Sequence, residues 1–260
     1  DAIGVRHSRR SYDGTRLSDA EQQALTQCCE RFRPYRDARV VFVPEPTSDV
    51  FLGVVGSYGK VTNAPSVLVF VGDTRDPYSD QHVGYTGEGL ILEATRLGLD
   101  TCWVGGFFRP KAAAALVDLA VGERIIAVSP VGRALTADSG SERVLRRLAG
   151  AKRRKPLDVI APGVGEAWPA WAVAGVEAAR VAPSAMNREP WRFAYTGDGI
   201  VLSVSHSPQT PRVTKELDCG IAMLHFELGA RFAGCEGAWE DLAGRAVAVW
   251  RPAPITWLYR

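Results

Sequence analysis

The first residues that could do chemistry stand near the start of the chain, where Arg6, Ser8 and Arg10 occupy every second position. In an extended segment this spacing places the three side chains on one side. Two guanidinium groups beside a hydroxyl suit a terminal phosphate, because bidentate, charge-assisted hydrogen bonds match its oxygens. A solvated basic tail is the alternative. This basic arm, residues 6–12, therefore predicts an anion site only if other residues complete it.

A second basic run, KRRKPLD at 152–158, places Lys152 and Arg154 shortly before Pro156. An exposed linker explains it, and a nucleic-acid site would need interleaved aromatic residues or a recognition helix, which we do not find. The chain carries 31 basic and 29 acidic residues, a net charge of +2. This balance gives no global field for nucleic acid or an anionic membrane, so we expect neither as a partner.

Two further stretches look suited to close contact with a ligand. WVGGFF at 103–108 pairs glycines after an apolar run, which lets backbone N–H groups approach a ligand that a Cβ would exclude. A tight turn without a ligand explains these glycines equally well. PSAMNREPW at 183–191 is a turn that could press its backbone against a flat ligand. Nothing around the turn supplies charge for the other end of such a ligand, so it predicts half of a site.

The cysteines and histidines show no metal or disulfide pattern. An odd number of cysteines without a C-x-x-C pair predicts neither a disulfide framework nor a zinc site, and we expect no metal. We find no secretory signal and no apolar run of 18 residues, so the expected compartment is the reduced cytoplasm. The residues are Cys28, Cys29, Cys102, Cys219, Cys235, His7, His82, His206 and His225.

The elements that must position these residues occur in two similar series. A helix at 17–32 has Ser18 as its N-cap and Glu21 as the capping-box partner. Apolar patterns then predict strands at 38–43 and 65–73, helices at 85–97 and 110–120, and a strand at 124–132. After a basic, glycine- and proline-containing connector at 136–167, the series restarts. The second series has helices at 168–181 and 218–234 and strands at 192–197, 200–206 and 245–251.

The restart suggests an internal duplication. A shift of 136 residues superimposes five identical residues within one helix and its exit turn. Two glycine-capped amphipathic helices that converged independently are the alternative. We favour duplication and predict an α+β fold of two related α/β repeats, residues 1–135 and 168–260, with helices packed on two related sheets. The identities are Gly84, Leu92, Ala94, Gly98 and Trp103 with Gly220, Leu228, Ala230, Gly234 and Trp239.

Together the motifs resemble the FMN-dependent nitroreductase family. The matching passages are R-x-S-x-R-x-[FY] at 6–12, a GLxTCWxGGF-like run at 98–107, K-x-R-x-P at 152–156 and P-S-x-x-N-x-x-P-W at 183–191. In that family the arm and the K-x-R pair hold the FMN phosphate, and the glycine turn gives a backbone donor to flavin N5. The resemblance therefore implies cofactor binding by Arg6, His7, Ser8, Arg10, Lys152 and Arg154.

The order of the motifs departs from ordinary family members. Those members carry P-S-x-x-N directly after the first helix, whereas residues 31–40 lack it here. Ordinary members are homodimers whose FMN lies across the interface. The chain resembles a branch in which one chain mimics the whole dimer, so we expect a monomeric pseudo-dimer. The mirror-related site lacks both the arm and the turn, so we expect one FMN per chain.

The resemblance also assigns the residues around the flavin ring. Pro183, Ser184 and Asn187 would line the flavin and ribityl from the second repeat. Gly105 and Gly106 would lie at the N5 edge, with the Gly106 N–H as donor. Lys60 in YGKVTNAP resembles a family lysine near N1 and O2, although a surface lysine is the alternative. Gly106 and Lys60 are the expected catalytic residues. Glu189 stands where members often have Gln.

The implied activity is ping-pong hydride transfer from NADH or NADPH through flavin N5 to a quinone, nitroaromatic or similar small acceptor. Nitroreductase-fold chemistry of another kind, such as dehydrogenation, dehalogenation or flavin fragmentation, stays open. So does a flavin-binding protein with little turnover, in which Tyr85, Phe107 or Phe108 covers the ring. A nucleic-acid or anion-binding module acting through 142–155 is a third possibility. The sequence shows no Ser-His-Asp or Cys-His nucleophile arrangement.

Overall fold

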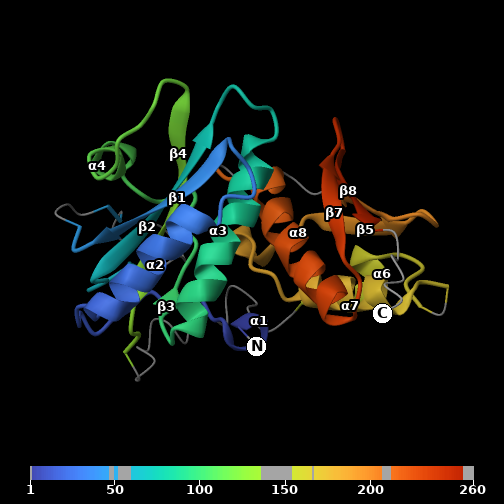
Figure 1. The fold of residues 1–260 in the computed structure, drawn as a ribbon, viewed down its shortest axis with the longest axis horizontal. Helices are drawn as coiled ribbons and strands as arrows, with labels where there is room; N and C mark the ends of the chain where they lie inside the picture. The colour runs from blue at the N-terminus through green and yellow to red at the C-terminus, as the bar shows by residue number, and fades with distance from the viewer. Residues whose placement is uncertain are drawn as a thin grey trace, which may run out of the picture.

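The computed structural model describes residues 2–46, 50–51, 60–135, 154–165, 167–206 and 212–253. Its elements form two halves, one before and one after residues 136–153 (Figure 1). The first half contains α1 (Ala2–Val5), α2 (Asp19–Arg31), β1 (Ala38–Pro44), β2 (Ser66–Asp73), α3 (Ser79–Arg96), β3 (Asp100–Thr101), α4 (Pro110–Ala114) and β4 (Glu123–Gly132). The second half contains α6 (Leu157–Ile160), α7 (Ala170–Arg180), the 3₁₀ turn η2 (Ala185–Asn187), β5 (Trp191–Tyr195), β6 (Ile200–Val204), α8 (Lys215–Phe232), β7 (Gly237–Asp241) and β8 (Ala246–Pro252).

Each half contributes one four-stranded antiparallel sheet, and the two sheets have the same strand order. The order is β1-β2-β4-β3 in the first and β5-β6-β8-β7 in the second. Each sheet also has a register shift in the pairing of its second strand, between Phe70 and Val71 in β2 and between Leu202 and Ser203 in β6. The series helix, two strands, helix, two strands therefore occurs twice, with α4 added between β3 and β4.

Most of the predicted strands and long helices match the structure, whereas the helix predicted at 110–120 ends at Ala114. The capping box of α2 is confirmed, since the Glu21 N–H donates to Ser18 Oγ and the Ser18 N–H to Glu21 Oε2. Helix α3 begins at Ser79 instead of Tyr85, because its first turn buries polar side chains that the apolar pattern does not reveal. Strand β7 was missed because its residues are only half-buried or exposed.

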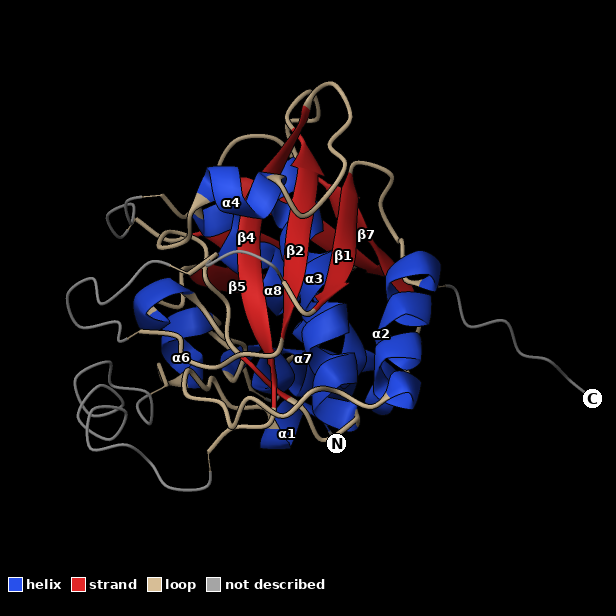
Figure 2. Cartoon of the chain, turned by 90° about the vertical axis from the view of Figure 1, so that its left-hand side faces the viewer, coloured by secondary structure: helices blue, strands red, loops and turns tan. Residues whose placement is uncertain are grey.

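Helices α3 and α8 lie side by side in the middle of the molecule, between the sheets (Figure 1). Figure 2 shows the first sheet in front of them. Two glycines allow their close approach, since a Cβ at Gly84 would lie 2.1 Å from the Leu217 carbonyl and one at Gly220 would lie 1.8 Å from the Gln81 carbonyl. The shift of 136 relates these contacts, because 81 + 136 = 217 and 84 + 136 = 220. The two helices therefore pack as a reciprocal pair.

Buried ion pairs at the start of α3 tie the halves together. His82 Nδ1 lies 2.8 Å from Asp37, which precedes β1, and His82 Nε2 lies 3.0 Å from Asp241 of β7. Tyr35 stacks on the imidazole at 3.8 Å. Burial lowers the pKa of His82, but the hydrogen bonds with Asp241 and Asp37 outweigh it and raise the pKa to about 9. His82 is therefore a cation between two carboxylates at neutral pH.

We expect this cation to make stability depend on alkaline pH. Because the folded pKa of about 9 exceeds the ordinary value of 6.5, its contribution is complete below about pH 6.5 and disappears as the pH rises through 9. The difference corresponds to about 3 kcal/mol. Urea unfolding of wild type and His82→Gln between pH 6 and 10 tests this. The stability gap between the two proteins should shrink as pH rises, and a constant gap would contradict the assignment.

Within the described residues, none of the helices combines the length and apolar character needed to cross a membrane.

Candidate functional site

The basic arm runs from the end of α1 along the edge of the first sheet. The Arg9 N–H donates to the Thr101 carbonyl at 2.9 Å, and the Thr62 N–H donates to the Arg10 carbonyl at 2.9 Å. These bonds hold the arm between β3 and the segment that follows Lys60. Arg6 Nη1 donates to Ser8 Oγ at 3.5 Å. The structure therefore brings Arg6 and Ser8 together, as their spacing predicts.

The Arg6 side chain is buried against a carboxylate of α3. It is only 7% exposed, and its Nε lies 3.9 Å from Oε1 of Glu88, which is fully buried. Glu88 also accepts a hydrogen bond from Trp103 Nε1 at 2.7 Å and lies 2.9 Å from Nε2 of His225 on α8. The buried Glu88 carboxylate thus connects the basic arm with Trp103, which precedes the glycine turn, and with helix α8 of the second half.

The turn at 183–189 has a strained backbone. Met186, Asn187 and Glu189 have φ values of 54°, 53° and 44°, which are in the left-handed region. Non-glycine residues in this region each cost on the order of 1–3 kcal/mol and persist only where the surroundings fix them. Such strain clusters at ligand-binding segments. The turn that we selected from the sequence is therefore held in an unusual shape.

Arg154 holds this turn from the segment before α6. Its Nη1 donates to the Ala182 carbonyl and to Asn187 Oδ1, and its Nη2 donates to the Val181 carbonyl, all at 2.9 Å. The Glu189 N–H donates to Ser184 Oγ at 3.0 Å. Two predicted cofactor residues, Arg154 and Asn187, are therefore joined directly. The hydrogen bonds of Arg154 to Asn187 and to the backbone just before the turn fix the conformation of the 183–189 turn.

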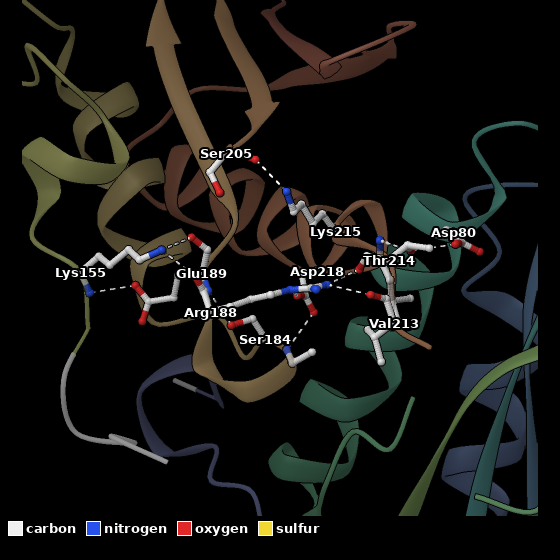
Figure 3. Close-up of polar contacts among 12 residues, drawn as sticks. Asp80, Lys155, Ser184, Arg188, Glu189, Ser205, Val213, Thr214, Lys215 and Asp218 are labelled. Atoms are coloured by element: carbon white, nitrogen blue, oxygen red, sulfur yellow. Dashed lines mark hydrogen bonds and ion pairs between the residues drawn. The ribbon is translucent and has the colours of Figure 1, made fainter. Parts of the chain in front are cut away.

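Glu189, the departure from the usual Gln, fixes the same segment (Figure 3). Its side chain is fully buried, and Oε2 accepts a hydrogen bond from the Lys155 N–H at 2.8 Å. Its Oε1 lies 3.5 Å from Arg154 Nη1. Lys155 Nζ in turn donates to the Glu189 carbonyl at 2.9 Å. A carboxylate at this position pairs with Arg154, which a neutral Gln could not do as strongly.

Arg188 joins the turn to the start of α8. Its Nε donates to Asp218 Oδ2 at 2.7 Å, and its Nη2 donates to the Val213 carbonyl at 3.2 Å (Figure 3). Asp218 Oδ1 also accepts the Ala185 N–H at 3.0 Å. Burial raises the pKa of Asp218 to about 6, although Arg188 and the Ala185 N–H oppose the shift. The turn is therefore anchored to α8 at both of its ends.

The segment before α8 continues to the glycine turn of the first half. A Cβ at Gly105 would lie 2.9 Å from Val213 Cγ2, so glycine is needed there for packing against the second half. Arg212 Nη1 donates to the Gly106 carbonyl at 3.2 Å. Residues 212–213 therefore contact the glycine turn directly and the 183–189 turn through Arg188. The motifs that lie far apart in the sequence meet along one boundary between the halves.

Other predicted residues have simpler positions. Pro183 is buried, Lys60 and His7 are exposed, and Lys152 lies outside the described residues. His7 Nδ1 lies 2.6 Å from the Val5 carbonyl. Tyr85, suggested as a residue that covers a ring, is buried, and its hydroxyl donates to Glu227 at 2.8 Å inside the helix pair. Phe108 is likewise buried, in the core on the outer face of the first sheet.

Sequence reasoning missed several residues that hold the site together. Each makes a long-range contact. All but the apolar Val213 are polar residues in segments whose sequence pattern is typical of an ordinary helix or loop. The signal for Arg188 was its place inside the P-S-x-x-N-x-x-P-W motif. The missed residues are Glu88, Arg188, Arg212, Val213, Asp218 and His225.

The chain matches one protein-family model and several solved structures. A protein-family model described as "Putative TM nitroreductase" matches residues 1–230. A solved structure from Thermotoga maritima, described as "a putative nitroreductase", aligns over 97% of this chain and 93% of its own, with 21% identity and a TM-score of 0.60. At that identity, the likeness concerns the fold alone. No curated protein matches the chain.

Shorter nitroreductase structures align with about half of the chain. An FMN-dependent nitroreductase from Clostridium difficile covers 53% of this chain and 88% of its own, with 14% identity and a TM-score of 0.45. A Bacteroides fragilis nitroreductase with bound FMN covers 53% and 89%, with 14% identity and a TM-score of 0.42. The family model spans most of the sequence, and the chain therefore belongs to this nitroreductase family and has its α+β fold.

Proposed function

We propose that the chain is an FMN-dependent oxidoreductase that takes electrons from NADH or NADPH and passes them to a small acceptor such as a quinone or nitroaromatic. The observation that carries this proposal is the meeting of the first half's arm and glycine turn with the second half's 183–189 turn along one boundary. Each half alone supplies only part of the residues that the family resemblance assigns to the cofactor. The two halves together supply a phosphate end and a ring end.

The residues at the phosphate end fit a terminal phosphate. Arg6 Nε is buried and makes no hydrogen bond among the described residues, and Oε1 of Glu88, with which it forms an ion pair, lies 3.9 Å away. A buried, unpartnered donor on a cation costs free energy unless a ligand or water satisfies it. Ser8 is exposed beside it, and Arg10 follows on the same arm. We assign these three residues to the FMN phosphate.

The ring end combines both halves. We assign the Gly106 N–H to flavin N5 and Lys60 to N1 and O2, where its charge would stabilise negative charge. The strained 183–189 turn would line the ring and ribityl through Pro183, Ser184 and Asn187. Bound FMN would supply the hydride and electron chemistry, so the chain needs no nucleophile of its own.

We further propose that the two halves arose by duplication and that a single chain replaces a homodimer. The repeated strand order and the reciprocal Gly84 and Gly220 contacts support this. The shift of 136 places His82 on Asp218. Where Asp218 anchors the strained turn, His82 instead lies between Asp37 and Asp241. Ion pairs fill the counterpart of the candidate site, which supports one flavin per chain.

Anaerobic mixing of the flavin-loaded protein with NADH or NADPH tests the activity. Bleaching of the absorbance near 450 nm, followed by reoxidation with a quinone or nitroaromatic, supports a reductase. Persistent yellow colour with both nucleotides would leave a flavin-binding protein and reject the reductase. A protein that binds no flavin would reject the whole proposal.

Replacing Asn187 should weaken FMN binding even though Asn187 lies in the second half. Asn187→Ala removes a contact worth about 0.5–1.5 kcal/mol, so the Kd for FMN should rise by roughly 2- to 12-fold. Asn187→Gly removes the same amide while tolerating the left-handed backbone, which separates contact from strain. Flavin fluorescence quenching measures both. Unchanged affinity in both variants would show that the 183–189 turn does not contact the cofactor.

A further inference from the structure

We propose that Arg180, in the last turn of α7, is a third guanidinium of the anion site formed with Arg6 and Arg154. The ligand we infer is a terminal phosphate monoester in its dianionic form. This inference rests on the proposed function and deepens it, because Arg180 lies in the second half and outside all four motifs. Together with Arg154, which also follows residues 136–153, Arg180 would place two guanidinium groups of the phosphate end in the second half.

The first observation is an orphaned donor on Arg180. Its Nε atom is buried and makes no hydrogen bond within the described part of the chain. Arg6 Nε, at the other side of the proposed site, is in the same state. Two buried guanidinium Nε atoms without acceptors imply either a cost in folding free energy or a ligand that supplies oxygen acceptors.

The second observation is that the end of α7 lies beside Arg154 and beside the buried carboxylate that pairs with Arg6. Arg154 donates to the carbonyls of the two residues that follow Arg180. His225 Nδ1 lies 3.2 Å from the Ala178 carbonyl, two residues before Arg180, and its Nε2 lies 2.9 Å from Glu88, the partner of Arg6. Burial lowers the pKa of Arg154, and the like charges of Arg6 and Arg180 lower it further, whereas Glu189 raises it. Arg154 itself donates to Val181, Ala182 and Asn187, so its guanidinium is fixed in place. Arg6 and Arg180 are therefore like charges that act on a guanidinium whose position is fixed.

The third observation is an imbalance of charge. Glu88 lies 3.9 Å from Arg6 Nε, and Glu189 lies 3.5 Å from Arg154 Nη1. Among the described residues, no carboxylate forms an ion pair with Arg180. Partly buried cations that repel one another are costly without an anion. Three guanidinium groups against two carboxylates leave one positive charge over, which favours an anion, and a phosphate monoester supplies negative charge together with three acceptor oxygens.

The first half provides a natural comparison. Helix α2 also ends in an arginine followed three residues later by proline, Arg31 and Pro34, as Arg180 is followed by Pro183. A cation in the last turn stabilises either helix through the helix dipole. Arg31 is exposed, however, whereas Arg180 is half-buried with a buried Nε. The dipole explains the residue type in both helices but not the burial of Arg180.

The test compares FMN with riboflavin, which has the same ring but no phosphate. Arg180→Gln should raise the Kd for FMN by about tenfold or more and change that for riboflavin by less than about twofold. Arg180→Lys, which keeps the charge but loses the fork, should fall between wild type and Arg180→Gln. Arg31→Gln is the matched control and should leave both constants unchanged.

A parallel measurement uses inorganic phosphate, whose binding should raise the melting temperature of wild type and of Arg31→Gln but not of Arg180→Gln. If Arg180→Gln and Arg31→Gln keep the wild-type ratio of FMN to riboflavin affinity, Arg180 has no place in the site, while the flavin proposal stands. If wild type binds neither flavin but responds to phosphate through Arg180, the proposed function fails and the anion site stands. If neither flavin nor phosphate responds to Arg180, the inference is overturned.

Discussion

Replacing Glu88 with alanine should lower the free energy of unfolding by about 3–5 kcal/mol, the largest stability effect that we expect. The change leaves three buried or half-buried partners without their shared acceptor. These are the Arg6 guanidinium, Trp103 Nε1 and the His225 imidazole. Both nitrogens of His225 lie near acceptors, since its Nδ1 is 3.2 Å from the Ala178 carbonyl. Removing the carboxylate therefore disrupts contacts in both halves.

Urea unfolding at neutral pH measures this effect. Glu93→Ala is the matched control, because Glu93 lies on the same helix, is 24% exposed and pairs with Arg96. A surface pair of this kind contributes about 0–1 kcal/mol. Similar losses in the two variants would show that Glu88 is not the buried junction that the contacts indicate. Glu88→Gln, which keeps an acceptor for Trp103, should lose less than Glu88→Ala.

The double substitution of Arg6 and Arg10 by alanine should produce the largest loss of FMN affinity. Each charge-assisted hydrogen bond to phosphate contributes about 1.5–3 kcal/mol, so the pair contributes about 3–6 kcal/mol. The Kd for FMN should rise by more than about a hundredfold. Riboflavin affinity should change little, because riboflavin has no phosphate. Isothermal titration with both flavins gives the two constants.

Two further variants distinguish the loss of phosphate contacts from a general folding defect. Arg10→Ala alone leaves the buried Arg6 and Glu88 contact in place and should still weaken FMN binding selectively. Arg9→Ala is the neighbouring control, since Arg9 Nε lies 4.0 Å from Asp100 on the first sheet. It should leave FMN affinity within about threefold of wild type. Equal losses of FMN affinity in Arg9→Ala and Arg10→Ala would show that the basic arm does not bind the phosphate.

Much of the fold was predictable because its signals are local. The Ser18 capping box starts α2, and Gly98, with φ of 75°, follows the end of α3. Buried strands β1, β2 and β4 appear as continuous β-branched runs. The start of α3 was not predictable in this way, because His82 is buried only through its partners Asp37 and Asp241. Those partners lie in another part of the sequence.

The features of the candidate site also divide into those that local motifs predict and those that depend on tertiary contacts. The motifs indicated which segments belong together, since Asn187 and Arg154 are joined in the structure. The motifs could not indicate that the described hydrogen bonds of Arg154 are made to residues in and just before the 183–189 turn. They also could not indicate that the missing Cβ of Gly105 leaves space for Val213. They also could not explain Glu189, whose partners come from residues 154–155. Each of these is a tertiary pairing that follows from the fold.

The central claim is that two halves of one chain hold a single flavin between them. The most direct test is the absorbance spectrum of the purified protein after loading with FMN, together with its flavin content and its mass in solution. The account predicts a yellow monomer with one FMN per chain. Two FMN molecules per chain, or a colourless protein that excess FMN does not convert, would contradict it.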